Sequence, residues 1–202
     1  MSDDVLDLYA DVSRTIAARK PVSEVADLLI HLWSTRADCV PGSSVKYFQH
    51  GQAEFVVDQA DGPAAAHDIR TLGAMTFATP PNQPRENYYQ RRFPLVTHDN
   101  QETDRGHLVS YSAGGLYGPN LFRQDRALNR GRSAEGRQYR EMENAAVRAN
   151  AFFFGALVYG DETDFPVAVE LGIVLDQTLQ VRRFRNRFDA VSFELFSDAG
   201  VM

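Results

Sequence analysis

The stretch DRGHLVSYSAGGLYGPNLFRQDRALNRG, residues 104–131, gathers side chains whose types fit the cleavage of a phosphodiester bond. That reaction needs a base to activate water, a cation to neutralise developing charge, and a proton source or metal ion at the leaving oxygen. His107 belongs to the residue type whose unperturbed pKa suits a base near neutral pH. Asn120 and Asn129 offer amide oxygens, and a hard ion such as Mg²⁺ prefers oxygen ligands and keeps several waters.

Each residue of this set also has a structural explanation. His107 could pack at a strand end, and Asn120 follows a proline and could be a turn residue. Asn129 could terminate a strand, and Glu143 could pair with an arginine on the solvent face of a helix. The residue types alone leave both readings open, so their order and spacing must decide between them.

Four ordered motifs occur in this part of the chain. They are Asp-Arg-Gly-His at 104–107, Asn-Leu-Phe-Arg-Gln at 120–124, Leu-Asn at 128–129 and Tyr-Arg-Glu-Met-Glu at 139–143. One short string arises by chance too often to identify a protein, whereas four in order are much rarer. Together they resemble the DNA/RNA non-specific endonucleases, the sugar-non-specific branch of the ββα-metal (His-Me finger) nucleases. The resemblance covers residues 85–188.

The chain departs from the family pattern around the last motif. Tyr139 replaces the commoner Trp and Met142 the commoner Leu, and both are tolerable as packing changes. The segment RGRSAEGRQ is longer than in compact family members, and it places Glu143 fourteen residues beyond Asn129. Glu135 is therefore a competitor for the carboxylate role.

The resemblance implies roles for five residues. His107 would be the general base for the attacking water, and Asn129 would be the direct protein ligand of a Mg²⁺ ion, with Mn²⁺ as the alternative. Glu143 would hold metal-bound water, as groups around a metal site commonly do. Asn120 would position His107 or the scissile phosphate, and Arg105 would support the site or its phosphate.

Arginine is the expected phosphate-binding residue type. Residues 81–150 carry 11 Arg, no Lys and 8 acidic residues, whereas the whole chain has a net charge of −6. Guanidinium groups suit bidentate phosphate recognition, although an ordinary solvated surface would have a similar composition. Arg130 and Arg132 are predicted to bind substrate. The full set of candidates, of which Arg105 and Arg132 are nearest the motifs, is Arg85, Arg91, Arg92, Arg105, Arg126, Arg130 and Arg132.

Length and composition are those of a globular domain. The chain has 202 residues, of which 44% are hydrophobic and 24% charged. No apolar run is long enough to span a bilayer, so no membrane partner is expected, and the N-terminus lacks the features of a secretory (Sec) signal peptide. The single Cys39 excludes an intrachain disulfide and a cysteine-based zinc site.

Apolar periodicity predicts an α+β protein. Two amphipathic helices are expected within residues 3–36, and a further helix over 134–149 with Ser133 as its N-cap. Strands are expected at 45–48, 53–57, 151–159, 167–175 and 179–184, with a Pro-rich loop at 79–86. With the resemblance, this predicts a ββα-metal nuclease core with an antiparallel sheet over 41–202. An N-terminal helical extension over 1–40 would either complete the core or serve as an adaptor.

The sequence therefore predicts a metal-dependent endonuclease that hydrolyses DNA, RNA or both with little sequence or sugar specificity. Two alternatives stay open. One is a degenerate member that binds nucleic acid or a protein without cleavage, although such a module would not need His107 and Asn129. The other is an unrelated protein in which the motifs are coincidental. Because an active nuclease endangers its host, we expect a bacterial toxin-type enzyme that is either exported without a Sec signal or inhibited in the cytoplasm by a tight-binding immunity protein.

Overall fold

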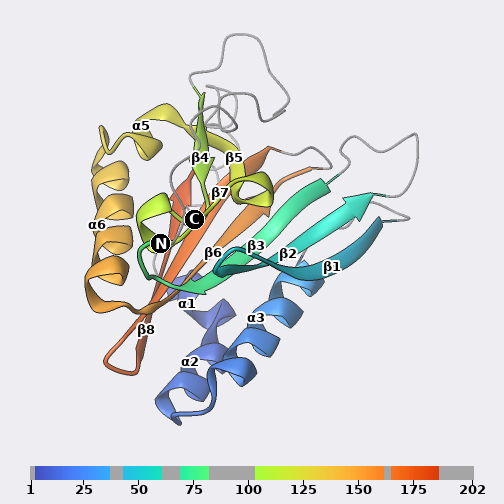
Figure 1. The fold of residues 1–202 in the computed structure, drawn as a ribbon, viewed down its shortest axis with the longest axis vertical. Coiled ribbons are helices and arrows are strands. Elements are labelled where there is room, and N and C mark those ends of the chain that lie inside the picture. Colours follow the sequence, from blue (N-terminus) through green and yellow to red (C-terminus); the bar gives the residue numbers. More distant parts are fainter. Residues whose placement is uncertain (1–2, 37–42, 61–68, 82–102, 162–164, 187–202) are drawn as a thin grey trace, which may run out of the picture.

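The computed structural model describes residues 3–36, 43–60, 69–81, 103–161 and 165–186. Its main sheet consists of β1 (Ser43–His50), β2 (Ala53–Ala60), β3 (Ile69–Phe77), β6 (Phe152–Tyr159), β7 (Pro166–Leu175) and β8 (Thr178–Arg185). The spatial order is β1-β2-β3-β6-β7-β8, and every neighbouring pair is antiparallel (Figure 1). The α+β class and the antiparallel sheet are confirmed.

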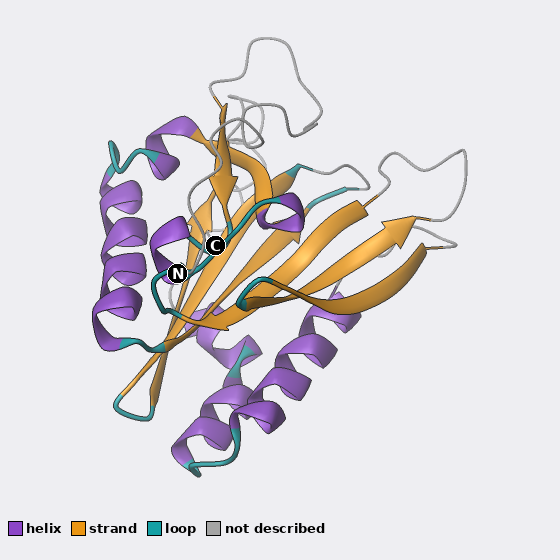
Figure 2. Ribbon diagram, viewed as in Figure 1, coloured by secondary structure: helices purple, strands orange, loops and turns teal. Residues whose placement is uncertain are grey.

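Helices cover both faces of this sheet, and each face has its own hydrophobic core (Figure 2). In β6, Phe153 belongs to the first core, whereas Phe152 and Phe154 belong to the second. Successive strand residues point to opposite faces. A strand that is buried on both sides therefore reads as a continuous apolar run, as β6 does, rather than as an alternating one.

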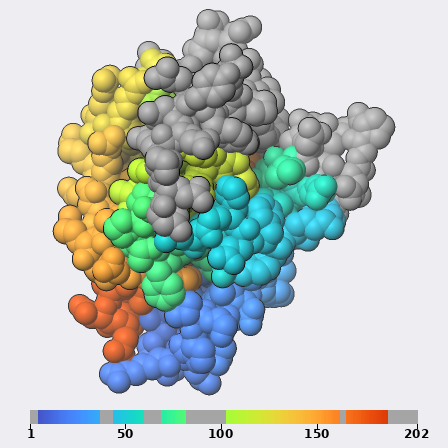
Figure 3. Space-filling model, in the orientation of Figure 1, coloured from blue at the N-terminus to red at the C-terminus, as the bar shows by residue number. Residues whose placement is uncertain are grey.

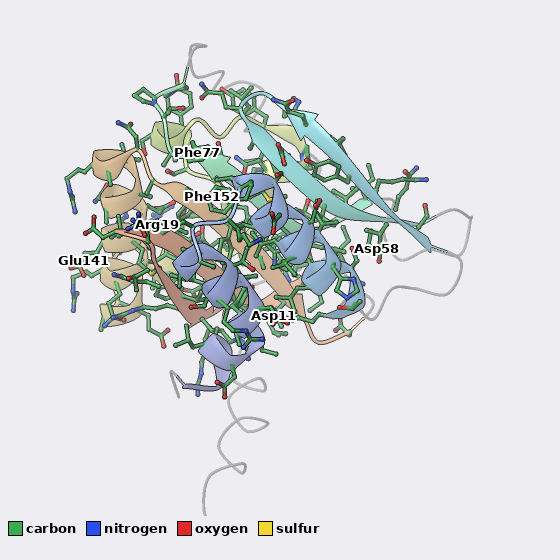
Figure 4. The ribbon with its side chains drawn as sticks, turned by 90° about the horizontal axis from the view of Figure 1, so that it is seen from below. Asp11, Arg19, Asp58, Phe77, Glu141 and Phe152 are labelled. Atoms are coloured by element: carbon green, nitrogen blue, oxygen red, sulfur yellow. The ribbon has the colours of Figure 1, made fainter. Side chains whose placement is uncertain are left out.

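The N-terminal segment lies over the second core as three helices, α1 (Asp3–Leu8), α2 (Ala10–Ala17) and α3 (Val22–Arg36) (Figure 4). The helical region is confirmed, but the prediction of only two helices was wrong. The first predicted helix is interrupted at Tyr9, where the backbone adopts φ −103° and ψ 19°. The Tyr9 ring is fully buried and stacks on Phe154 at 5.2 Å between centroids. Burial of this ring takes precedence over continuing the helix.

A buried carboxylate fastens these helices to the sheet. Glu170, in β7, is fully buried and accepts a hydrogen bond of 2.6 Å from the Tyr9 hydroxyl. Arg36 of α3 donates to it at 2.7 and 3.0 Å, and Arg183 of β8 donates at 2.8 and 2.5 Å. Burial alone would raise the pKa of Glu170, but these donors outweigh it and lower the pKa. The domain boundary predicted between residues 40 and 41 lies outside the described residues.

The first core is covered by a second, smaller unit. It contains β4 (Thr103–His107), the 3₁₀ turns η1 (Tyr111–Ala113) and η2 (Gly118–Asn120), β5 (Leu121–Asp125), α5 (Arg126–Asn129) and α6 (Ala134–Ala149). Strands β4 and β5 form an antiparallel pair separate from the main sheet. The helix predicted over 134–149 is confirmed, and the Ser133 hydroxyl accepts a hydrogen bond from the Gly136 N–H at 2.9 Å. In the space-filling view α6 forms one flank of the molecule (Figure 3).

Two close contacts fix this unit to the main sheet. A Cβ atom added to Gly155 of β6 would come within 2.6 Å of Leu108, so the absence of a side chain there lets the chain after β4 lie on the sheet. Asn186, at the end of β8, accepts a hydrogen bond from the Asp125 N–H at 2.7 Å and donates to the Arg123 carbonyl at 2.8 Å. The β4–β5 pair is thereby held to the main sheet near both of its ends.

The five predicted strands are confirmed. The apolar pattern predicted neither the small pair of β4 and β5 nor β3. Strand β3 is hard to recognise in the sequence, because the buried polar residues Arg70 and Thr76 interrupt the apolar pattern of IRTLGAMTF. Arg70 is stabilised inside the fold by Asp58 of β2, at 3.1 Å, and by the face of the Tyr159 ring, 4.5 Å from its guanidinium. Of the predicted Pro-rich loop, residues 79–81 are irregular, and the rest lies outside the described residues.

Candidate active site

The motif residues meet around the β4–β5 pair. His107 is the last residue of β4 and lies opposite Leu121, the first residue of β5. The next backbone N–H, that of Leu108, donates to the Asn120 carbonyl at 2.9 Å. The histidine is half-buried, and it stands where the pair opens into the loop that contains η1 and η2. His107 therefore stands at the open end of a small antiparallel strand pair.

The glycine of the first motif is required by a close approach from β5. A Cβ atom at Gly106 would lie 2.1 Å from Oε1 and 2.6 Å from Cβ of Gln124. The Gln124 side chain therefore lies directly on the backbone of β4, next to His107. This contact explains in steric terms why a glycine precedes the histidine and a glutamine closes the second motif.

Asn120 braces the loop behind His107. It is fully buried, and its Oδ1 accepts a hydrogen bond from the Val109 N–H at 2.8 Å. Its Nδ2 donates to the carbonyls of Val109 at 2.8 Å and Leu116 at 2.7 Å. The amide is thus engaged on both sides with the backbone, and it does not line the pocket described next.

A pocket of about 340 Å³ opens beside His107. Strand β4, strand β5, turn η1, helix α5 and helix α6 all contribute to its walls. The lining residues are His107, Ser110, Tyr111, Ser112, Gln124, Asn129, Tyr139, Arg140, Glu143 and Asn144. Residues from the first, second, third and fourth sequence motifs therefore share one cavity.

Asp104 orients the Asn129 amide. Asn129, the last residue of α5, donates from Nδ2 to Oδ2 of Asp104 at 3.0 Å, and Arg130 donates to both oxygens of the same carboxylate at 2.7 and 2.8 Å. Burial alone would raise the pKa of Asp104, but the hydrogen bonds and the charges of Arg130 and Arg126 outweigh it and lower the pKa. An ionised carboxylate only accepts hydrogen bonds, so the NH₂ group of Asn129 faces Asp104. Its Oδ1 is left without a hydrogen bond among the described residues.

Glu143 contributes the carboxylate of the pocket. It lies on α6, is half-buried, and burial raises its pKa to about 7, while the nearby Arg140 acts in the opposite direction. Arg140 is exposed, and its guanidinium donates to the Asn129 carbonyl at 3.4 and 3.2 Å. Glu135, the competitor for the carboxylate role, lies in the first turn of α6 and does not line the pocket.

The structure brings together only part of the predicted site. His107, Asn129 and Glu143 line the pocket, whereas Arg105 and Arg132 are exposed outside its lining. Arg130 also lies outside the lining, with its guanidinium engaged by Asp104. The further arginine candidates Arg85, Arg91 and Arg92 fall outside the described residues.

Seven of the ten side chains that line the pocket have no chemical role predicted from the sequence, and three of these, Gln124, Tyr139 and Arg140, belong to the second and fourth motifs. Arg140 is three residues before Glu143 and shares its helix face, a spacing that could have identified it. Gln124 belongs to the second motif, so its presence was noted without a role. The aromatic residue of the fourth motif predicts packing, and the sequence pattern does not distinguish a role for the Tyr139 hydroxyl.

The donor set around the pocket fits a hard, hydrated cation better than a soft metal. Within the described part of the chain, no group of three or more His, Cys, Asp or Glu residues is arranged to hold a metal ion. Asn129 offers a free amide oxygen and Glu143 a carboxylate, and Mg²⁺ is commonly held by one or two oxygen ligands together with water. Zinc sites usually have three or four nitrogen, sulfur or carboxylate ligands.

No protein-family model matches the chain, and no curated protein matches it. Among solved structures, it is similar to the Sda1 nuclease with a bound zinc ion, with 15% sequence identity and a TM-score of 0.44. The match covers 68% of this chain and 77% of that chain. A likeness of this degree does not define an activity. None of the helices in the described ranges has the length and apolar character needed to cross a membrane.

Proposed function

We propose that this protein is a metal-dependent nuclease that hydrolyses phosphodiester bonds in DNA, RNA or both. One observation carries the proposal. An imidazole, a free amide oxygen and a carboxylate, from His107, Asn129 and Glu143, line the same pocket although they come from three different elements. The order of the four motifs supports the same assignment, because their parts converge in space.

His107 is the general base of the proposed reaction. Its side chain borders the pocket at the open end of β4, where a water molecule can lie between the imidazole and a bound phosphate. A general base must be within hydrogen-bond reach of the proton that it removes. His107 takes one proton of the attacking water, and the water oxygen forms the new bond to phosphorus. The bond from phosphorus to the leaving oxygen breaks at the same centre, and the leaving oxygen takes a proton from solvent water.

Asn129 and Glu143 are the residues that would hold the divalent cation. The Asn129 Oδ1, on the side of the amide away from Asp104, would be the direct ligand, and the Glu143 carboxylate would accept hydrogen bonds from water around the ion. When bound, a Mg²⁺ ion supplies positive charge that stabilises the phosphate and the leaving oxygen. Mn²⁺ is a suitable substitute because it also prefers oxygen ligands.

Arg140 is the phosphate-binding residue that the pocket favours over Arg130 and Arg132. It lines the pocket and makes no ion pair with a carboxylate among the described residues, whereas Arg130 is engaged with Asp104. Arg105 keeps a supporting role outside the lining. Asn120 acts indirectly, since its buried amide fixes the backbone that follows His107.

Contacts to phosphate carry no sequence information, so a site built from these groups cleaves with little base preference. The expected toxin-type role, with an immunity protein or export without a Sec signal, rests on the hazard of such an activity and stays a prediction. A degenerate protein that binds nucleic acid without cleavage is the alternative. The pocket favours the enzyme, because a binding module needs neither an imidazole nor a free amide oxygen at this place.

Incubation of the purified protein with plasmid DNA and with total RNA tests the proposal. The reactions contain Mg²⁺, Mn²⁺ or a chelator, at low salt where binding to phosphates is strongest. We expect both polymers to be cut with either ion and neither with the chelator. Binding without cleavage by the folded protein would support the degenerate alternative. The absence of both binding and cleavage would overturn the nuclease proposal and that alternative.

A further inference from the structure

Two buried polar atoms at the pocket have no hydrogen-bond partner among the described residues. They are Nε2 of Gln124 and the hydroxyl oxygen of Tyr139. Both residues line the pocket, yet Gln124 is only 1% exposed and Tyr139 only 2%. An unsatisfied buried polar atom destabilises a fold, and most buried polar atoms in native proteins have a partner. We therefore expect these two atoms to gain hydrogen-bond partners when the site is in its active state.

Packing holds both side chains in place. The Tyr139 ring meets Phe184 edge-on, with 5.2 Å between centroids and 69° between planes. The Gln124 side chain is fixed against Gly106 of β4, as the 2.1 Å approach to an added Cβ shows. Neither polar end can turn away to bulk solvent without disturbing the core.

The third member of this group is Glu143. It follows Tyr139 by four residues on α6, so the two side chains share a helix face. Burial raises the pKa of the Tyr139 hydroxyl, the charge of Glu143 raises it further, and the Gln124 amide lowers it. All three side chains line the same pocket.

We propose that Gln124 and Tyr139 form a chain of hydrogen-bond donors that positions the Glu143 carboxylate. When the cation is bound and Glu143 is ionised, the Gln124 amide donates to the Tyr139 hydroxyl, which in turn donates to a carboxylate oxygen of Glu143. Consecutive hydrogen bonds polarise and strengthen one another, most of all in a buried setting. The inference rests on the proposed function, in which Glu143 holds the water around the divalent cation. Gln124 and Tyr139 are positioning residues, since they act through Glu143.

Tyr139→Phe removes one oxygen atom and keeps the ring. Because that oxygen has no partner in the protein, we expect the melting temperature of the metal-free variant to be unchanged or higher than that of the wild type. We expect its cleavage rate to fall about 10- to 100-fold at an unchanged KM, as for other groups that orient metal ligands. The rise in melting temperature on adding Mg²⁺ should shrink as well. Gln124→Met, which keeps the length of the side chain, should behave in the same way.

Tyr159→Phe is the matched control. Its hydroxyl donates to the Thr71 carbonyl at 2.7 Å, so this variant should lose stability and keep the wild-type response to Mg²⁺. A Tyr139→Phe protein with wild-type cleavage and Mg²⁺ response would overturn the inference and leave the proposed function standing. If the wild-type protein shows neither cleavage nor a rise in melting temperature with Mg²⁺, both the inference and the proposed function are overturned. If Tyr139→Phe does not fold, Gln124→Met decides by the same criteria.

Discussion

Gln124 lies directly against Gly106, so that a Cβ atom at position 106 would approach its Oε1 to 2.1 Å and its Cβ to 2.6 Å. The second of these contacts involves the base of the side chain, which cannot rotate away. We therefore expect Gly106→Ala to lower the free energy of unfolding by about 1–3 kcal/mol, as overpacking does. Urea unfolding measures this change. Gly160→Ala, at an exposed site where the nearest atom would be 3.2 Å away, should cost clearly less. Equal losses for the two variants would contradict the steric account.

Asn120 and Asn129 should respond in opposite ways to removal of their amides. Asn120→Ala leaves the Val109 N–H and two backbone carbonyls without buried partners, so we expect a loss of stability of about 2–4 kcal/mol. Asn129→Ala removes a single hydrogen bond to Asp104, which water can replace. This variant should keep nearly wild-type stability and lose metal-dependent cleavage. Thermal unfolding and cleavage assays on both variants separate the two roles. A stable, inactive Asn120→Ala protein would argue for a direct catalytic role instead.

Glu143 should make the stability of the metal-free protein depend on pH. Its pKa of about 7 in the folded state lies above the ordinary value of 4.5, so the folded state binds the proton more tightly. The contribution of Glu143 to stability is therefore largest at acidic pH, and it falls by on the order of 1–3 kcal/mol as the pH rises from about 4.5 through 7. Because a cation favours the ionised carboxylate, affinity for Mg²⁺ should increase over the same range.

Denaturant unfolding of wild type and Glu143→Gln between pH 4 and 8 checks this dependence. The difference between the two proteins isolates Glu143 from other carboxylates, since Asp104 and Glu170 have lowered pKa values and act with the opposite sign. Glu141→Gln is the control, because Glu141 is exposed on the same helix and points outward (Figure 4). A Glu143→Gln variant with the wild-type pH profile would show that the carboxylate is not held in a buried setting.

Arg140 should contribute one phosphate contact. Arg140→Ala is expected to weaken binding to all sequences alike and to reduce the slope of log K against log salt by about 1. Fluorescence anisotropy with a labelled oligonucleotide at several salt concentrations gives this slope. Arg137→Ala, at an exposed position on the same helix outside the pocket, should leave the slope closer to that of the wild type. The assignment fails if Arg137→Ala has the larger effect.

Glu170 should be important for attachment of the N-terminal helices. Glu170→Gln weakens the bonds from Tyr9, Arg36 and Arg183, so we expect a loss of about 2–4 kcal/mol. The stabilisation by the ionised carboxylate is present above the ordinary pKa and is lost as the pH falls through its lowered folded value. Denaturant unfolding of the variant and the wild type at pH 7 measures this loss of stability. A negligible change there would mean that the apolar contacts of the helices suffice.

Sequence patterns predicted the local elements well where one signal dominated. The helix after Ser133 has a capping residue and a run of good helix formers, and both ends were predicted correctly. The break at Tyr9 and the strand β3 were not predicted, because each depends on distant partners. Tyr9 turns inward to meet Phe154 and Glu170, and β3 carries an arginine that only Asp58 makes tolerable in the interior.

The candidate site was predictable in its residue types but not in its contacts. The motif order identified His107, Asn129 and Glu143, which line one pocket. The engagement of Arg130 by Asp104 and the place of Arg140 at the pocket follow from how α5 and α6 pack, which no spacing in the sequence reveals. The same holds for the approach of Gln124 to Gly106, since it joins two strands across the small sheet.

Cleavage by His107→Ala, compared with wild type and with His50→Ala, tests the central claim most directly. His50 is an exposed histidine at the end of β1, outside the pocket, and controls for the loss of an imidazole elsewhere. With plasmid DNA and Mg²⁺, we expect His107→Ala to lose at least about 100-fold in rate, in the range typical of a general base, while His50→Ala cuts like the wild type. A folded His107→Ala protein that cuts at the wild-type rate would contradict the account.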